Sequence, residues 1–312
     1  MSEIVEPASR RMRWKVISIV AAAVLLAGGF AFLQYRRQVV SYVTHWKGAP
    51  GHTVAYVPFP ADPPPELRIA VAGDIGDSGS RLDATGAAMA RLEGKDDFDA
   101  LLLLGDNVYP AGDPAQLPAT VFAPFAGVLD GGTDLLAILG NHDKPRGDAQ
   151  LRALGMPGHW WADQRGDVLL VGLDSNRWAD RTQRRWLERT LRETTATWKI
   201  VALHHPPYSA GYQGSNMDVR RAFAPIFERF GVQLVLSGHD HDYQRSKLIN
   251  SVTYVVTGAA AGTRRTGEAS FTAVSFSWHS FVELGVWPDR LVGRVMNQDD
   301  RVADEWTLRL GR

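Results

Sequence analysis

The chain of 312 residues contains no cysteine. Without thiols it can form neither a disulfide framework nor a metal site built from thiolates. It also lacks an overall charge, because 34 Lys and Arg balance 34 Asp and Glu. This balance hides an asymmetry: residues 1–47 carry seven basic and two acidic side chains, so they contribute +5 and the remaining residues −5. An acidic body argues against a nucleic-acid-binding groove as the main function.

Long apolar runs are also scarce, and the one exception covers residues 16–33, eighteen residues without a charge. As a helix this run would rise about 27 Å, near the lower limit for crossing a hydrocarbon core. Four basic residues precede it, and Arg36 and Arg37 follow it. The larger basic cluster favours a cytoplasmic N-terminus. We therefore expect a basic cytoplasmic segment at 1–15, a transmembrane signal anchor at 16–34, and a catalytic domain outside the inner or plasma membrane.

Two alternatives to the anchor stay open. A signal peptide cleaved near Gly29 would release the protein after export, and a buried core helix would keep the run inside the fold. Residues 35–66 are rich in proline, including the run 63–65. Proline restricts φ and favours an extended, semi-rigid chain, so this segment is predicted to be a tether.

From residue 67 to 312 the pattern becomes that of a single α/β catalytic domain. Short runs of Val, Ile and Leu bounded by Gly or Asp are typical of buried strands, and longer amphipathic segments lie between them. Strands are predicted at 67–72, 100–104, 134–139, 168–173, 199–203, 232–236 and 253–257, with a hairpin at 281–297. Helices are predicted at 84–92, 182–192 and 219–230.

Five short motifs follow ends of these predicted strands. They read GDIG at 73–76, GDNVY at 105–109, GNHD at 140–143, VALH at 201–204 and GHDH at 238–241. Open α/β sheets present ligand-binding groups at the carboxyl ends of their strands, so the motifs should meet at one place. Their carboxylate, phenol, amide and imidazole groups can hold two metal ions, which would clamp a phosphoryl group and activate a water. The candidate ligands are Asp74, Asp106, Tyr109, Asn141, His204, His239 and His241.

The series of motifs resembles the calcineurin-like metallophosphoesterases. Tyr109, three residues after Asp106, narrows the resemblance to the purple acid phosphatase branch, of the small tartrate-resistant acid phosphatase type. The resemblance covers residues 67–262 and implies a two-sheet β-sandwich flanked by helices, in the order α-β-β-α. It also implies an Fe(III) ion and a divalent Fe, Zn or Mn ion. The Fe(III) ligands would be Asp74, Tyr109 and His241, the divalent ligands Asn141, His204 and His239, with Asp106 bridging both ions. Alternatively, Tyr109 packs near the site without binding metal.

The resemblance implies that a metal-bound hydroxide attacks phosphorus and that His142 stabilises the transition state or protonates the leaving group. Asp143 is expected to orient the His142 ring. His205 either binds phosphate or caps its loop. Relatives carry another histidine further along, whereas residues 209–214 contain none, which puts catalysis at acidic pH in doubt. Candidates for the pocket rim are Asp77, Lys144, Arg146, Tyr208, Tyr212 and Tyr243.

We therefore predict a phosphomonoesterase acting on a phosphoester substrate, with a membrane contact through its N-terminal helix and no nucleic-acid groove. One alternative is a phosphodiesterase that acts on nucleotide or lipid-type diesters with the same metals. The other is a non-catalytic phosphate-binding protein on the same fold.

Overall fold

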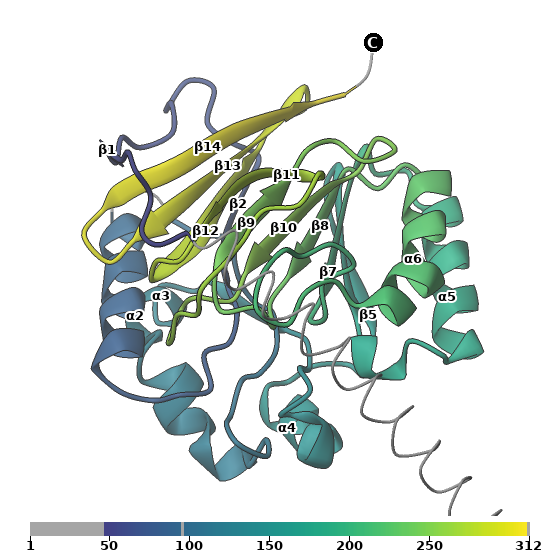
Figure 1. Cartoon of the computed structure of the whole chain (residues 1–312), viewed down its shortest axis with the longest axis horizontal. Coiled ribbons are helices and arrows are strands. Elements are labelled where there is room, and N and C mark those ends of the chain that lie inside the picture. The colour runs from purple at the N-terminus through teal and green to yellow at the C-terminus, as the bar shows by residue number, and fades with distance from the viewer. Residues whose placement is uncertain (1–46, 95–96, 311–312) are drawn as a thin grey trace, which may run out of the picture. The chain divides into compact units, whose positions relative to one another are not determined.

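Two seven-stranded mixed sheets form the centre of the domain in a computed structural model that describes residues 47–94 and 97–310 (Figure 1). The first sheet has the order β1 (Val54–Ala55), β14 (Arg301–Arg309), β13 (Arg290–Asn297), β12 (Ser280–Val286), β2 (Leu67–Ala72), β3 (Ala100–Leu103) and β4 (Asp134–Ala137). The second has the order β11 (Thr272–Phe276), β9 (Tyr243–Ser246), β10 (Thr253–Thr257), β8 (Leu234–Ser237), β7 (Trp198–Leu203), β6 (Val168–Leu173) and β5 (Trp161–Arg165).

Each sheet contains a parallel section, which lies at one side of the first sheet and in the middle of the second. In the first sheet β2, β3 and β4 run parallel, and in the second β6, β7, β8 and β10 do. Their carboxyl ends therefore lie at a common edge within each sheet, which is where ligand-binding groups of such sheets gather.

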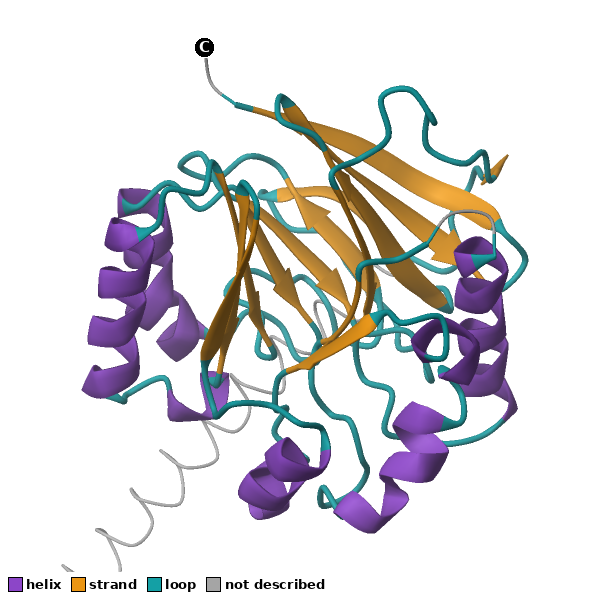
Figure 2. Ribbon diagram, turned by 180° about the vertical axis from the view of Figure 1, so that it is seen from behind, coloured by secondary structure: helices purple, strands orange, loops and turns teal. Residues whose placement is uncertain are grey.

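Helices cover the outer face of each sheet, as Figure 2 shows from behind. The helices α2 (Ser80–Glu93) and α3 (Ala126–Leu129) pack on the first sheet, and α5 (Arg181–Glu193) and α6 (Met217–Arg229) pack on the second. A third apolar layer, which includes Trp198 and Ile69, lies between the sheets. This confirms the predicted α-β-β-α sandwich.

Short helices occupy the connections near the carboxyl ends of the strands. They are the 3₁₀-helices η1 (Pro114–Gln116), η3 (Lys144–Arg146) and η4 (Ser175–Arg177), the π-helix η2 (Pro118–Phe122), and α4 (Gly147–Ala153). These connections, rather than the sheets, carry most of the polar groups discussed below.

The N-terminal predictions need a correction. Among residues 47–94 and 97–310, no helix has the length and apolar character needed to cross a membrane. The predicted anchor at 16–34 and the basic segment at 1–15 lie outside the described residues. The localisation at the inner or plasma membrane, with an extracytoplasmic domain, is contradicted by this finding, because nothing in the described chain supplies the apolar length that a bilayer requires. It is withdrawn together with its alternative, export after signal cleavage, and with the membrane as a partner.

The described part of the predicted tether contacts the first sheet. Strand β1 pairs with β14, and the buried ring of Phe59 meets Trp287 edge-on at 5.2 Å between ring centroids. The indole N–H of Trp287 donates to the carbonyl of Pro63 at 3.0 Å. An extended, proline-rich chain can still bury alternate side chains, which is what Phe59 does. The domain boundary at residue 67 stays a prediction.

Candidate metal centre

Three of the candidate ligands form one group, in which Asp74 and Tyr109 follow strands of the first sheet and His241 follows β8 of the second. The Tyr109 hydroxyl lies 3.3 Å from Asp74 Oδ1 and 3.1 Å from His241 Nε2, and these last two atoms are 3.4 Å apart. Asp74 directly follows the glycine after β2, while Tyr109 lies in the loop between β3 and η1. Three donor atoms so close together, from three separate connections, can bind one cation.

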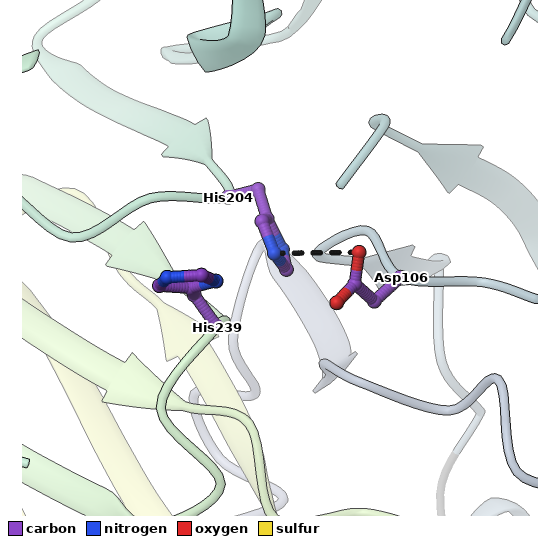
Figure 3. A group of neighbouring side chains, drawn as sticks. All are labelled: Asp106, His204 and His239. Carbon is purple, nitrogen blue, oxygen red and sulfur yellow. Dashed lines mark ion pairs between the residues drawn. The ribbon is translucent and has the colours of Figure 1, made fainter. Parts of the chain in front are cut away.

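The other four candidate ligands form a second group. Donor atoms of Asp106, His204 and His239 all lie within 4.8 Å of one another, and Figure 3 shows their side chains converging. Asn141 Oδ1 is 3.1 Å from His204 Nε2, which in turn is 3.5 Å from Asp106 Oδ1. The Nδ1–H of His204 donates to the carbonyl of Leu104 at 2.8 Å, so Nε2 is the nitrogen left to bind a metal.

The two groups are joined through the backbone. The N–H of His239, in the second group, donates to Asp74 Oδ2, in the first, at 2.7 Å, while the N–H of His142 donates to Asp106 Oδ1 at 2.9 Å within the second group. Asp74, Asp106 and His239 have φ values of 57°, 50° and 72°, in the left-handed region that L-residues seldom adopt. Such backbone strain is concentrated at functional sites and persists only where the surrounding structure holds it.

Neighbouring glycines make these approaches possible. A Cβ added at Gly140 would lie 2.1 Å from Asp106 Oδ1, and one added at Gly238 would lie 2.6 Å from Asp74 Oδ2. Both glycines belong to the predicted motifs, so the motifs supply the space for the ligands as well as the ligands themselves.

Burial and neighbouring charges shift the pKa values of several candidate ligands. Burial, followed by the charges of Asp74 and Asp106, raises the pKa of Tyr109 well above 10, so a phenolate there requires a cation beside it. Burial alone would lower the pKa of His204, but Asp106 outweighs it and raises the pKa to about 10. For His239, burial and then the charge of His204 lower the pKa to about 2. The donor set fits two metal ions, since carboxylate and phenolate oxygens suit a hard trivalent ion and imidazoles a divalent one.

The histidine after Asn141 faces this centre, but its orienting partner is not the predicted one. The Nδ1–H of His142 donates to the carbonyl of Pro110 at 2.8 Å, and its ring meets the Tyr109 ring edge-on at 4.7 Å between centroids. Asp143 is fully buried and accepts instead from the backbone N–H groups of Gly140 and Asn107, at 2.8 and 3.1 Å. The expectation that Asp143 orients His142 is wrong, because its carboxylate instead connects the loop after β4 to the loop after β3 by hydrogen bonds.

His205 lies beside the second ligand group. Its ring centroid is 4.6 Å from that of His239, and its Nδ1 is 2.8 Å from Ser175 Oγ. The same Ser175 hydroxyl accepts the backbone N–H of His205 at 3.0 Å. Burial, and then the charge of His204, lower the pKa of His205 to about 3, which keeps the ring neutral. Ser175 was missed from the sequence, although it lies two residues after β6 and the strand-end argument applied to it equally.

A second missed feature is the pair of buried carboxylates on either side of His241. Asp240 accepts from the Ser209 hydroxyl and from the backbone N–H of Gln213, the latter at 2.6 Å, while Asp242 accepts from the Gln244 side chain at 3.0 Å. Burial raises the pKa of both carboxyl groups. Through these bonds the loop that follows His205 is held against the loop that carries His239 and His241.

The predicted rim residues divide into two sets. Asp77, Lys144, Arg146 and Tyr212 are exposed. Tyr208 is half-buried against Tyr254, and Tyr243 is fully buried and donates to Asp304 at 2.8 Å. Tyr243 is therefore wrong as a rim residue, because its place on β9 turns it into the core between the sheets.

Comparisons with known proteins agree with this geometry. A family model described as "Calcineurin-like phosphoesterase" matches residues 67–243. Purple acid phosphatase 3 of Arabidopsis thaliana is 25% identical over 241 residues, which cover 64% of this chain and 65% of that protein. Tartrate-resistant acid phosphatase type 5 of Oryctolagus cuniculus is 35% identical over 79 residues, 25% of this chain and 24% of that protein.

The fold has a counterpart among solved structures. A purple acid phosphatase isolated from yellow lupin (Lupinus luteus) seeds superposes with a TM-score of 0.68 at 16% identity, covering 84% of this chain and 55% of the other. At that identity the likeness concerns the fold alone. The chain thus spans about two thirds of the first of these relatives and about half of the lupin protein.

Proposed function

Because the chain belongs to the calcineurin-like phosphoesterase family, we propose that it is a binuclear-metal hydrolase that acts on phosphate monoesters. One observation carries the proposal. The group of Asp74, Tyr109 and His241 lies next to the group of Asp106, Asn141, His204 and His239, and the backbone N–H of His239 donates to Asp74 across the two.

Two bound ions would neutralise the phosphate oxygens and lower the pKa of a water molecule enough to make it a nucleophile near neutral pH. Side chains of the protein position the substrate and protonate its leaving group. His142 has its Nδ1–H fixed on the Pro110 carbonyl, so in the imidazolium form its Nε2–H is free to donate to a phosphate oxygen or to give its proton to the leaving group. His205, held neutral and fixed by Ser175, offers its second ring nitrogen to the substrate.

The two ligand groups differ in chemistry, which supports different ions in each. The oxygen-rich group around Tyr109 would hold Fe(III), and the group with two imidazoles and an amide would hold divalent Fe, Zn or Mn. Tyr109→Phe tests the first assignment. The variant should fold, because within the described residues the Tyr109 hydroxyl has hydrogen-bond partners in Asp74 and His241 alone, both candidate ligands. It should lose any visible absorption band of the iron-loaded protein, and an unchanged band would exclude phenolate ligation.

The central test compares a chromogenic phosphate monoester with the corresponding diester. The full-length chain is loaded with iron and a divalent metal and assayed from pH 4 to 9. Preference for the monoester is the expected result, and preference for the diester would make the protein a phosphodiesterase with the same ligands. Asn141→Ala, measured beside it, should reduce kcat/KM by about 100-fold or more, since it removes a ligand atom. Unchanged rates in this variant would contradict metal-dependent catalysis.

A further inference from the structure

A basic cavity lies beside the candidate metal centre. Its volume is about 360 Å³, and five of its lining side chains are basic or imidazole groups, against one carboxylate. They are Lys144, Arg146, Arg152, Arg177, His159 and the carboxylate Asp148. The cavity is formed by η3, α4 and η4, and Figure 1 shows α4 apart from the helices that cover the sheets.

Two loops connect this cavity to the metal centre. Lys144 follows His142 by two residues, so their Cα atoms are at most about 7.6 Å apart. In the other loop, Asn176 donates its side-chain N–H to the carbonyl of Gly140 at 3.0 Å, and Ser175 bonds to His205. The next residue, Arg177, lines the cavity. The residues that line the cavity thus continue directly from residues at the metal centre.

The positive charge of the cavity is only partly neutralised. Arg146 lies 3.8 Å from Asp113, and Arg177 lies 3.4 Å from the buried Asp174. His159 bridges Asp174 and Asp148, at 2.7 Å from each. Lys144 and Arg152 are exposed, and their side chains form no ion pair or hydrogen bond with any residue in the described ranges. These two cations stand in a body, residues 48–312, whose net charge is −5.

From this placement we propose that the cavity is a second anion subsite, which binds another phosphate group of the substrate while the first lies at the metal centre. The substrate class is then a small molecule with two or more phosphate groups. This inference rests on the proposed function. The seven candidate ligands concern the phosphate that is hydrolysed, whereas the cavity would bind a phosphate that stays on the substrate. Lys and Arg form charge-assisted hydrogen bonds to phosphate, which are stronger than those between neutral groups.

The test uses the full-length, metal-loaded protein with fructose 6-phosphate and fructose 1,6-bisphosphate, a pair that differs by one phosphate. We expect the wild type to have a kcat/KM for the bisphosphate about tenfold above that for the monophosphate. In Lys144→Gln/Arg152→Gln this ratio should fall to near 1. The two side chains form no ion pair or hydrogen bond within the described ranges, so their replacement breaks none there. Arg189→Gln, exposed on α5, is the matched control and should retain the wild-type ratio.

A second measurement separates the cavity from catalysis. Binding of fructose 1,6-bisphosphate to the metal-free protein is followed by calorimetry, and the double variant should bind at least about tenfold more weakly than wild type and Arg189→Gln. Equal ratios and equal binding in wild type and double variant would overturn the subsite. If the wild type hydrolyses neither sugar phosphate and no other phosphoester, the proposed function fails, while calorimetry still decides whether the cavity binds phosphate.

Discussion

Gly140 marks the tightest contact at the centre. A methyl group there would lie 2.1 Å from Asp106 Oδ1 and 2.3 Å from the Asp106 backbone nitrogen. Gly140→Ala should therefore displace Asp106, lower the metal content of the purified protein, and reduce kcat/KM by about 10–100-fold. Metal analysis and steady-state kinetics measure both effects. Gly51→Ala, where an added Cβ meets nothing within 4 Å, is the control. Full metal content in Gly140→Ala would contradict this expectation and show that the loop around residue 140 can move to accommodate a methyl group.

His279 supplies a pH effect away from the candidate ligands. Burial, and then the charge of Arg81, lower its pKa below the ordinary 6.5. The unfolded chain therefore takes up a proton at a higher pH than the folded chain, and stability present above pH 6.5 is lost as the pH falls through the folded pKa. His279→Gln should reduce the fall in Tm between pH 7.5 and pH 5. If wild type and variant lose the same number of degrees, another group controls this range.

For single residues, the sequence predicted where the candidate site residues lie better than it predicted what each of them contacts. The seven candidate ligands lie together because each follows the end of a buried strand, and strand ends are visible as apolar runs that stop at Gly. The partners of Asp143 and Tyr243 could not be predicted, because both depend on segments far away along the chain. Asp143 meets the loop after β3, and Tyr243 meets Asp304 on β14.

Among the elements, α6 has a well-defined N-terminal cap. The side chain of Asn216 accepts the backbone N–H of Val219 at 3.0 Å, which satisfies a donor that the first turn leaves free. Asn216→Ala should lower the free energy of unfolding by about 1 kcal/mol in urea denaturation, and Asn216→Ser should recover most of this loss. A loss in Asn216→Ser as large as in Asn216→Ala would assign another role to the residue.

The predicted elements are those with a strong apolar signal. Strands β2, β6 and β10 have the predicted bounds because helices or the opposite sheet cover both faces, so every residue is buried. The strands β5 and β14 were missed. Both lie at or near a sheet edge and alternate buried with exposed residues, as in the sequence WADQR of β5. Strands with so many polar residues resemble loops until their pairing partner is known.

At the scale of the molecule, the centre draws on both sheets. Asp74, Asp106 and Asn141 follow strands of the first sheet, whereas His204 and His239 follow strands of the second. Metal bound to both groups would therefore favour the folded state by mass action. Removal of metal with a chelator should lower the Tm, and readdition should restore it in proportion to the logarithm of metal concentration. In Asn141→Ala the difference in Tm between the metal-loaded and the metal-free protein should be smaller than in wild type. A Tm independent of metal would mean that the ions bind folded and unfolded chains alike.

The left-handed backbone at Asp74, Asp106 and His239 has a consequence for how this protein tolerates change. Each such residue costs about 1–3 kcal/mol of local strain. Replacing Asp74 by Gly would relieve the strain at this position, so it should yield an inactive protein that unfolds at a higher temperature than the metal-free wild type. A library selected for heat resistance alone would therefore drift toward loss of this centre, and retention of the centre requires selection for turnover.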